Sequence, residues 1–208
     1  MPSASDGASL RVVHNSADAP AVDVVANNQF ASPLIKNLSF PNFTDYLTVP
    51  AANYNVKVTA AGMQTAVINA DLGLSNGVNY TVIALDTLNK IAPLVLVDKP
   101  RPIATEAQLR AVHGSSLAGL VDVYVTAPGA SINTINPAIK NFAFKADSGY
   151  LGLPPGNYAI SLTLPGTKTI ALGPLDVSLE AGGIYTVLAR DEVGLGGASV
   201  TLLDDFNP

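Results

Sequence analysis

Two histidines are the only imidazole side chains in the sequence, and each follows a short apolar run. His14 is followed by Ser16 and Asp18, whereas Leu117 stands four residues after His113. Imidazole titrates near neutral pH, so either histidine could bind a metal ion or act as a general base. A metal site usually needs three or four ligands, and only His14 has a carboxylate, that of Asp18, four residues further along the chain. The pattern favours structural histidines that bond the following serine and the turn backbone, with metal binding through His14 and His113 as an alternative.

Two aspartates, Asp23 and Asp122, lie between valines in segments of strand-like sequence. Such a side chain faces solvent or pairs with a cation on a neighbouring strand, and Arg11 and Arg110 stand at matching positions. We therefore predict two structural ion pairs, one between Arg11 and Asp23 and one between Arg110 and Asp122. Calcium binding would need more clustered oxygen ligands than these segments offer. The candidate binding or turn motif thus consists of His14, Asp18, Asp23, His113 and Asp122.

Catalytic chemistry has little support in the sequence. The chain contains no cysteine, which excludes a thiol nucleophile, a disulfide framework and a zinc site built on thiolates. It also contains no Gly-x-Ser-x-Gly elbow, no phosphate-binding glycine loop and no pair of glutamates suited to glycoside hydrolysis. We predict no enzymatic activity, no catalytic residue, no resident metal and no cofactor.

A tandem duplication is the strongest signal in the sequence. Residues 10–16 (LRVVHNS) return as residues 109–115 (LRAVHGS), and the Val-Asp-Val of residues 22–24 returns at the same spacing. Later blocks match at slightly larger spacings, as expected for two copies of one domain with small loop insertions. We predict a flexible leader over residues 1–9, a first domain over 10–98, a proline-containing linker over 99–107 and a second domain over 108–208.

Alternation of apolar and polar residues indicates strands rather than helices. Tyr54, Val56 and Val58 share one face of a segment, and the second copy repeats the pattern. Turns rich in Pro, Gly and Asn separate such segments. The predicted fold class is all-β, with two tandem Ig-like or transthyretin-like β-sandwich domains. Residues 105–111 have helical propensity, but the matching residues of the first copy are strand-like, so we predict a strand over residues 109–113.

Tyrosines that open strands are assigned structural roles. Tyr80 and Tyr185 follow glycine-containing turns, as in the tyrosine corner of immunoglobulin-like sandwiches, and we expect their hydroxyls to bind a turn carbonyl. Sugar-binding platforms often use exposed tryptophan, and this chain has none. Core or corner positions are therefore favoured over sugar stacking.

The composition excludes several classes of protein. Apolar residues make up 48% of the 208 residues, charged residues 13%, and the formal net charge is −5. An intrinsically disordered chain or a basic nucleic-acid binder would show the opposite balance. No apolar run is long enough to span a bilayer, so we predict no transmembrane segment. Residues 1–7 lack the features of a secretory signal, and the abundant small polar residues favour a secreted or envelope-associated chain without its signal peptide.

The opening of the first copy, residues 11–24 (RVVHNSADAPAVDV), carries the most specific motif. Together with the Pro-x-Gly-x-Tyr of residues 154–158, it resembles the pattern of a bacterial and archaeal cell-surface family, the domain of unknown function family 4397. The first copy has Ala52 in place of the glycine, and the second has Leu-Ala-Gly at residues 117–119 in place of Asp-Ala-Pro. The resemblance covers nearly the whole chain. It implies an exported, envelope-associated β-sandwich and no enzymatic activity.

These observations lead to one functional prediction and two alternatives. We predict a non-catalytic, exported cell-envelope protein with a structural, adhesive or protein-interaction role, which contacts envelope proteins or itself and binds no nucleic acid. Edge strands with few charges are poorly guarded against pairing, which favours self-assembly. The first alternative is a carbohydrate- or peptidoglycan-binding module, and the second is a metal-binding protein that uses His14 and His113.

Overall fold

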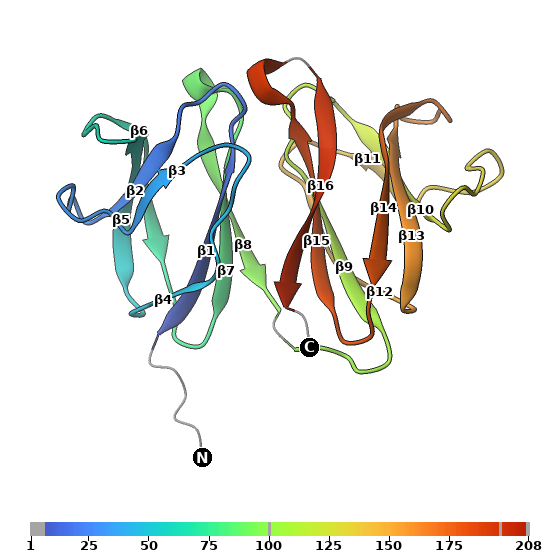
Figure 1. The fold of residues 1–208 in the computed structure, drawn as a ribbon, viewed down its shortest axis with the longest axis horizontal. Coiled ribbons are helices and arrows are strands. Elements are labelled where there is room, and N and C mark those ends of the chain that lie inside the picture. Colours follow the sequence, from blue (N-terminus) through green and yellow to red (C-terminus); the bar gives the residue numbers. More distant parts are fainter. Residues whose placement is uncertain (1–6, 100, 196, 207–208) are drawn as a thin grey trace. The chain divides into compact units, whose positions relative to one another are not determined.

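The computed structural model describes residues 7–99, 101–195 and 197–206 (Figure 1). The chain divides into two compact units, Met1–Lys99 and Pro100–Pro208, which we call repeat 1 and repeat 2. Each repeat consists of two four-stranded sheets that enclose an apolar core. The predicted all-β fold of two tandem sandwiches is confirmed.

Repeat 1 pairs its strands in the sheet orders β4-β1-β7-β8 and β3-β2-β5-β6. A 3₁₀ turn, Leu88–Lys90, precedes the last strand. The strands are β1 (Ala8–Asn15), β2 (Val22–Ala26), β3 (Ile35–Leu38), β4 (Leu47–Val49), β5 (Asn53–Ala60), β6 (Ala66–Gly73), β7 (Asn79–Leu85) and β8 (Ala92–Asp98).

Repeat 2 has the same arrangement, with the sheet orders β12-β9-β15-β16 and β11-β10-β13-β14. A second short turn, Val193–Leu195, occupies the position of the first. The strands are β9 (Ala107–His113), β10 (Val121–Thr126), β11 (Ile139–Phe142), β12 (Asp147–Leu153), β13 (Gly156–Thr163), β14 (Ile170–Leu179), β15 (Ile184–Asp191) and β16 (Ala198–Phe206).

Equivalent strands keep equivalent register. The first strand of each repeat runs parallel to the seventh, so that Leu10 lies opposite Tyr80 and Leu109 lies opposite Tyr185. The other strand pairs within these sheets are antiparallel. This shared register identifies matching positions in the two repeats even where the residues differ.

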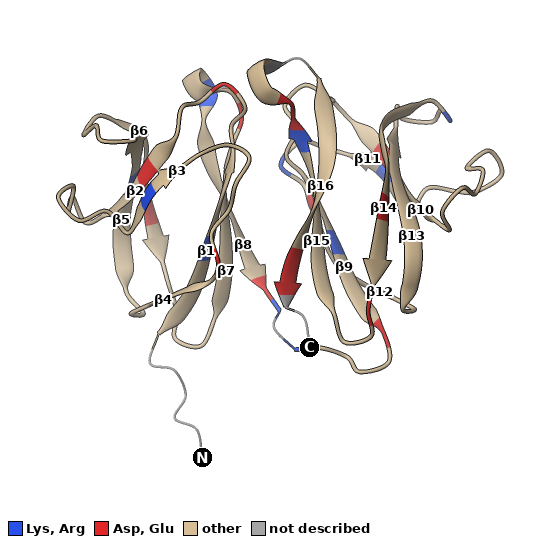
Figure 2. Cartoon of the chain, viewed as in Figure 1, with Lys and Arg blue, Asp and Glu red and all other residues tan. Residues whose placement is uncertain are grey.

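The period-two pattern explains both cores. Residues of one parity on each strand face the opposing sheet, and these are Leu, Val, Ile, Ala and Tyr in both repeats. Few charged residues lie on the strands (Figure 2). The interior of each sandwich is therefore built by the alternation that identified the strands.

The predicted boundaries differ from the structure by a few residues. Strand β1 begins at Ala8, inside the predicted leader 1–9, because Ala8 pairs with Val49 of β4. Strand β9 begins at Ala107, the last residue of the predicted linker 99–107, because Ala107 pairs with Leu153 of β12. Residues 1–6 and 100 lie outside the described residues. The strand predicted over residues 109–113 is confirmed within β9.

Helices contribute little to the described part of the chain. Within it, no helix is both long enough and apolar enough to cross a membrane.

Candidate functional site

His14 lies near the end of β1 and is buried. Its Nε2 lies 3.0 Å from the carbonyl oxygen of Pro20, and its Nδ1 accepts the backbone N–H of Ser16 at 3.4 Å. These contacts place the proton on Nε2 and leave the ring neutral. Burial lowers the pKa of His14 below its usual value. The serine and turn contacts are those expected of a structural histidine.

His113 occupies the equivalent position at the end of β9 and is also buried. Its Nε2 lies 2.7 Å from the carbonyl oxygen of Gly119, whereas its Nδ1 has no hydrogen-bond partner. Burial lowers the pKa of His113, and the bond to Gly119 and the charge of Asp191 oppose this shift. Because His113 is buried and its Nε2 is bonded to a carbonyl oxygen, this nitrogen is not accessible to a metal ion or a substrate.

Asp18 holds the turn that follows His14 in repeat 1. Its Oδ1 accepts the backbone N–H of Leu88 at 2.8 Å and the hydroxyl of Ser16 at 3.4 Å. The carboxylate thereby joins the loop after β1 to the turn before β8. Its role in repeat 1 is to hold two loops together.

Repeat 2 has Leu117 in place of Asp18, and a carboxylate from another strand serves the same turn. Asp191, the last residue of β15, accepts the hydroxyls of Ser115 at 2.5 Å and Ser116 at 2.7 Å. It also accepts the backbone N–H groups of Ser116 at 3.1 Å and Leu117 at 3.3 Å. Asp191 is not among the residues predicted from the sequence, although its match with Asp86 of repeat 1 is a signal that could have identified it.

Asp23 binds backbone rather than a cation. Its two carboxylate oxygens accept the N–H groups of Asn37 and Gly62, both at 2.8 Å. These bonds, that of Gly62 first, hold the pKa of Asp23 below its usual range. Repeat 2 makes the same two contacts at 2.8 Å, from Asn141 and Gly166 to Asp122, with the same effect on the pKa of Asp122.

The predicted ion pair between Arg11 and Asp23 is wrong, because β1 and β2 belong to different sheets. The guanidinium of Arg11 donates to the Thr81 hydroxyl at 3.0 and 3.1 Å and lies 4.8 Å from the ring centroid of Tyr46. Thr81 and Tyr46 in turn donate to Asp98 at 2.7 and 2.9 Å. These four residues form a buried polar cluster across the sheet of β1.

The corresponding prediction for Arg110 and Asp122 is wrong for the same reason. Arg110 lies 3.6 Å from Asp205 in an ion pair, and its guanidinium lies 4.7 Å from the ring centroid of Tyr150. Thr186 and Tyr150 donate to Asp205 at 2.5 and 3.0 Å. The sequence contained a signal for both clusters, because the arginines, tyrosines and threonines recur at the spacing of the duplication.

The tyrosine corner is present with a different hydrogen-bond direction. The hydroxyl of Tyr80 accepts the backbone N–H of Ser75 at 3.2 Å, and that of Tyr185 accepts the N–H of Glu180 at 3.1 Å. The expected bond to a turn carbonyl was wrong for this pair. Both residues still fasten a turn to the first residues of a core strand.

A polar pocket of about 440 Å³ lies beside Asp122 on repeat 2. Lys168 donates to the Tyr124 hydroxyl at 3.0 Å, and its Nζ lies 4.5 Å from the ring centroid. Tyr124 is buried, so its ring offers no surface on which a sugar could stack. The polar groups in the lining come from Asp122, Tyr124, Asn136, Lys140, Asn141 and Lys168.

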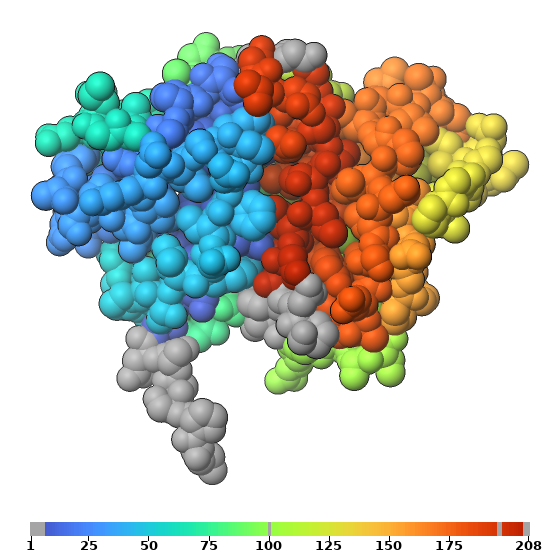
Figure 3. All heavy atoms as spheres, in the orientation of Figure 1, coloured from blue at the N-terminus to red at the C-terminus, as the bar shows by residue number. Residues whose placement is uncertain are grey.

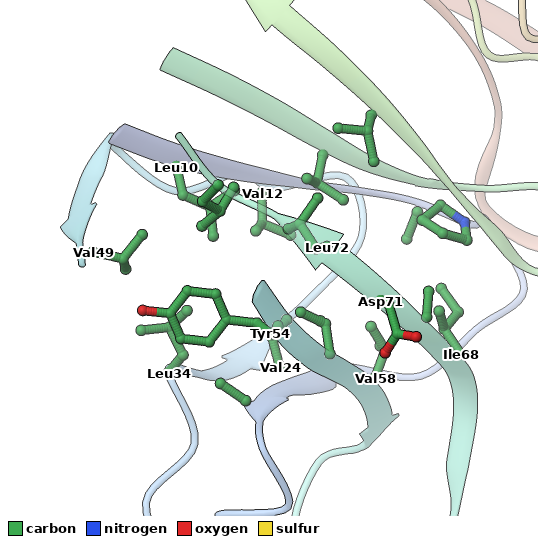
Figure 4. Close-up of a pocket in the computed structure, with 18 of the residues that line it drawn as sticks. Leu10, Val12, Val24, Leu34, Val49, Tyr54, Val58, Ile68, Asp71 and Leu72 are labelled. Atoms are coloured by element: carbon green, nitrogen blue, oxygen red, sulfur yellow. The ribbon is translucent and has the colours of Figure 1, made fainter. Parts of the chain in front are cut away.

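An apolar cavity of about 260 Å³ lies between the two sheets of repeat 1. Leu10 and Val12 of one sheet face Val24 and Tyr54 of the other across it (Figure 4). The lining is apolar or aromatic except for Asp71. No sequence pattern indicates this cavity, because most of the residues that line it follow the ordinary alternation of core residues.

The described residues contain no set of side chains that could bind a metal ion. Among residues 7–99, 101–195 and 197–206, no three or more His, Cys, Asp or Glu side chains are placed to hold a metal ion. In addition, the Nε2 atoms of His14 and His113 face backbone carbonyl oxygens.

The family comparison agrees with the duplicated architecture. The family model described as Domain of unknown function (DUF4397) matches residues 8–124 and 128–208. The chain belongs to this family. Two matching segments agree with a tandem member of the family, although the division between them, at residues 124–128, falls within repeat 2.

Similarity to solved structures is distant. The Bacillus anthracis TIE protein is 15% identical with a TM-score of 0.28 over 88% of this chain, and the chain spans about a third of its length (33%). A family 41 carbohydrate-binding module from streptococcal virulence factors is 10% identical, with a TM-score of 0.29 over 92% of this chain and 95% of the module. A candidate cell adhesion protein from Bacteroides ovatus is 10% identical, with a TM-score of 0.27 over 99% of both chains. Comparison with curated proteins finds no match.

The DUF4397 motif has one evident chemical capacity in this structure, which is to fasten loops. The histidines bind carbonyl oxygens and Asp18 binds the N–H of Leu88. Asp23 and Asp122 each bind one N–H of an edge strand and one of a turn that is distant in sequence. Buried polar groups of a sandwich are stable when they are paired in this way. The motif therefore accounts for the geometry of the loops at the ends of β1, β2, β9 and β10.

Proposed function

We propose that this DUF4397 protein is a non-catalytic, exported component of the cell envelope with a structural or adhesive role. One observation carries the proposal, namely that the motif's imidazoles and carboxylates bind the chain's own backbone in both repeats. A general base needs a nitrogen or oxygen within reach of a substrate, and His14 and His113 direct Nε2 to a carbonyl oxygen instead. The motif supports a durable scaffold rather than a reaction.

Edge strands supply the contact surface in this proposal. Strand β6 ends the sheet of β2, and β14 (orange in Figure 3) ends the sheet of β10. Each contains a single charged residue, and Val67 and Ile170 on them are exposed by 38% and 43%. An edge with unpaired backbone groups, exposed apolar side chains and few charges can accept a strand from another chain.

Light scattering coupled to size-exclusion chromatography over a wide range of concentration tests this self-association. We expect the mass to rise with concentration in the unmodified protein and to stay monomeric in the variants Val67→Lys and Ile170→Lys. Val193→Lys is the matched control, because Val193 is 72% exposed in a 3₁₀ turn that belongs to neither β6 nor β14. A monomer at every concentration, together with no retention on purified cell envelopes, would contradict the proposal.

Carbohydrate binding is the second candidate, and the polar pocket of repeat 2 favours it. Lys140, Lys168, Asn136 and Asn141 offer cationic and amide donors, which suit an acidic sugar held by hydrogen bonds rather than by stacking. A glycan array that includes uronic acid polymers and peptidoglycan fragments tests this. Binding should be lost in Lys140→Ala and kept in Lys36→Ala, the matching lysine of repeat 1. An array without any signal eliminates this candidate.

A further inference from the structure

The apolar cavity of repeat 1 differs from a closed sandwich core. It occupies about 260 Å³ between the sheets, and five of its lining residues are exposed: Leu34, Pro50, Asp71, Pro93 and Val95. Asp71, Pro93 and Val95 lie on the edge strands β6 and β8, and Leu34 and Pro50 adjoin the opposite edge strands, β3 and β4. The cavity therefore reaches the surface at the edges of the sandwich.

Repeat 2 provides an internal comparison, because several of its matching positions carry larger side chains, although Ala111 and Val177 are smaller than Val12 and Leu72. The strand register places Leu175 at the position of Ala70 and Leu202 at that of Val95. Ile160 replaces Val56 and is 1% exposed, whereas Val56 is only partly buried. Leu162 and Val125 similarly replace Val58 and Ala26. Five positions around the cavity are thus smaller in repeat 1.

Strand length contributes to the same difference. Strand β6 has eight residues and β14 has ten. Strand β8 has seven residues and β16 has nine. Shorter edge strands leave one side of repeat 1 less covered, so the opening and the small side chains occur together.

The chemistry of the lining defines what could enter. Asp71 is the one charged residue, and its carboxylate at the rim disfavours an anionic head group. The Tyr54 hydroxyl already donates to the Pro50 carbonyl oxygen at 2.8 Å. The remaining surface is apolar, and it offers burial of hydrocarbon rather than hydrogen bonds.

We propose that repeat 1 binds an uncharged apolar small molecule between its two sheets. A cavity of about 150 Å³ with an apolar lining binds benzene, so this one has room for a hydrocarbon of roughly ten carbon atoms. The ligand class is a neutral ring or short chain, and repeat 2 does not share the site. This role does not require the self-association proposed above, although both involve β6.

Methyl NMR of the full chain with 1-octanol as the probe tests the proposal. We expect saturable shifts at the methyl groups of Val12, Val82 and Ile68, with none at Leu162 and Leu172 of repeat 2. Sodium octanoate, which has the same chain length and a negative charge, should bind more weakly because of Asp71.

Two alanine-to-leucine variants on the same strand complete the experiment. Ala70→Leu places the side chain of repeat 2 in the cavity and should abolish the shifts, while a higher melting temperature shows that it folds. Ala66→Leu on exposed β6 surface is the control and should leave them intact. Shifts that do not saturate, that occur equally in both repeats or that survive Ala70→Leu would each overturn the proposal.

Discussion

The two repeats share a fold and a register but differ in two local features, the carboxylate that holds one turn and the packing of the core. In repeat 1 the turn after the histidine is held by Asp18 from within the motif, and in repeat 2 by Asp191 from the end of β15. The interior of repeat 1 contains a cavity of about 260 Å³, while larger side chains stand at five matching positions of repeat 2.

The use of Asp18 in repeat 1 and Asp191 in repeat 2 shows that the fold requires an acceptor at this turn but not at a fixed position in the sequence. Buried hydroxyl and backbone N–H donors must find an acceptor, since an unpaired one costs about 1–3 kcal/mol. The acceptor's place in the sequence is free as long as its oxygen reaches the turn. A motif that departs from the family pattern at residue 117 can therefore keep its geometry.

The difference in core packing between the two repeats predicts the largest effect, and a matched pair of leucines tests it. Leu10 and Leu109 stand at equivalent positions and are 3% and 4% exposed, but only Leu10 lines the cavity. We expect Leu109→Ala to lower the free energy of unfolding by about 4 kcal/mol and Leu10→Ala by about 2 kcal/mol. A leucine beside an empty space has fewer contacts to lose.

Denaturant unfolding of both variants measures this difference, and differential scanning calorimetry shows which repeat melts first. Equal losses would mean that repeat 1 packs as tightly as repeat 2 around this position.

The carboxylate difference predicts an intermediate effect. Asp191→Ala removes four hydrogen bonds to residues 115–117 and should cost about 3 kcal/mol, whereas Asp18→Ala should cost about 1 kcal/mol. Thermal melts followed by circular dichroism measure both. The double variant Asp191→Ala, Leu117→Asp returns the carboxylate to the position of repeat 1 and should recover part of the loss. A double variant that is no more stable than Asp191→Ala would show that the two carboxylates are not interchangeable.

The sequence predicted the architecture well because the signals are local. Alternation, turn residues and the duplication sufficed for the two sandwiches and for the strand at β9. The same local signals did not predict contacts between residues that are distant in sequence and come together only in the folded chain. The predicted pair of Arg11 and Asp23 assumes that their strands are neighbours, but β1 and β2 belong to different sheets. Asp98 lies instead within hydrogen-bond distance of Thr81, the residue to which Arg11 donates.

The candidate residues were identified more reliably than their partners. His14 and Asp23 do bind the loops that follow them, yet the particular backbone groups depend on loop paths that the sequence does not encode as a pattern. The cavity was beyond sequence reasoning for a related reason. Its lining residues follow the same alternation of core and surface positions as in repeat 2. The repeats differ there in the size of individual side chains and in the length of the edge strands, which no local sequence pattern reveals.

The two histidines should behave alike despite their different carboxylates. Both have a pKa lowered by burial, so the unfolded chain binds protons that the folded chain excludes. Stability is therefore complete above the unfolded histidine pKa of about 6.5 and falls as the pH drops below it, by up to about 1.4 kcal/mol per pH unit for each histidine. Asp23 and Asp122, with lowered pKa values, lose their contribution only below the usual aspartate range near 3.8.

Urea unfolding between pH 7.5 and pH 5 measures the histidine contribution separately from that of the aspartates. His14→Gln and His113→Gln should each remove about half of the slope, whatever their effect on stability at pH 7.5. A slope unchanged in the double variant would assign the pH dependence to other groups.

The smallest predicted effect concerns a contact that the two repeats share. Tyr54 and Tyr158 donate their hydroxyls to the carbonyl oxygens of Pro50 and Pro154, at 2.8 and 2.7 Å. Each bond closes a turn at the start of an equivalent strand and is accessible to solvent, so Tyr54→Phe and Tyr158→Phe should each cost about 0.5–1 kcal/mol in thermal melts. Unequal costs would imply that the cavity next to Tyr54 weakens even local contacts, since the geometry of the hydrogen bond is the same in both repeats.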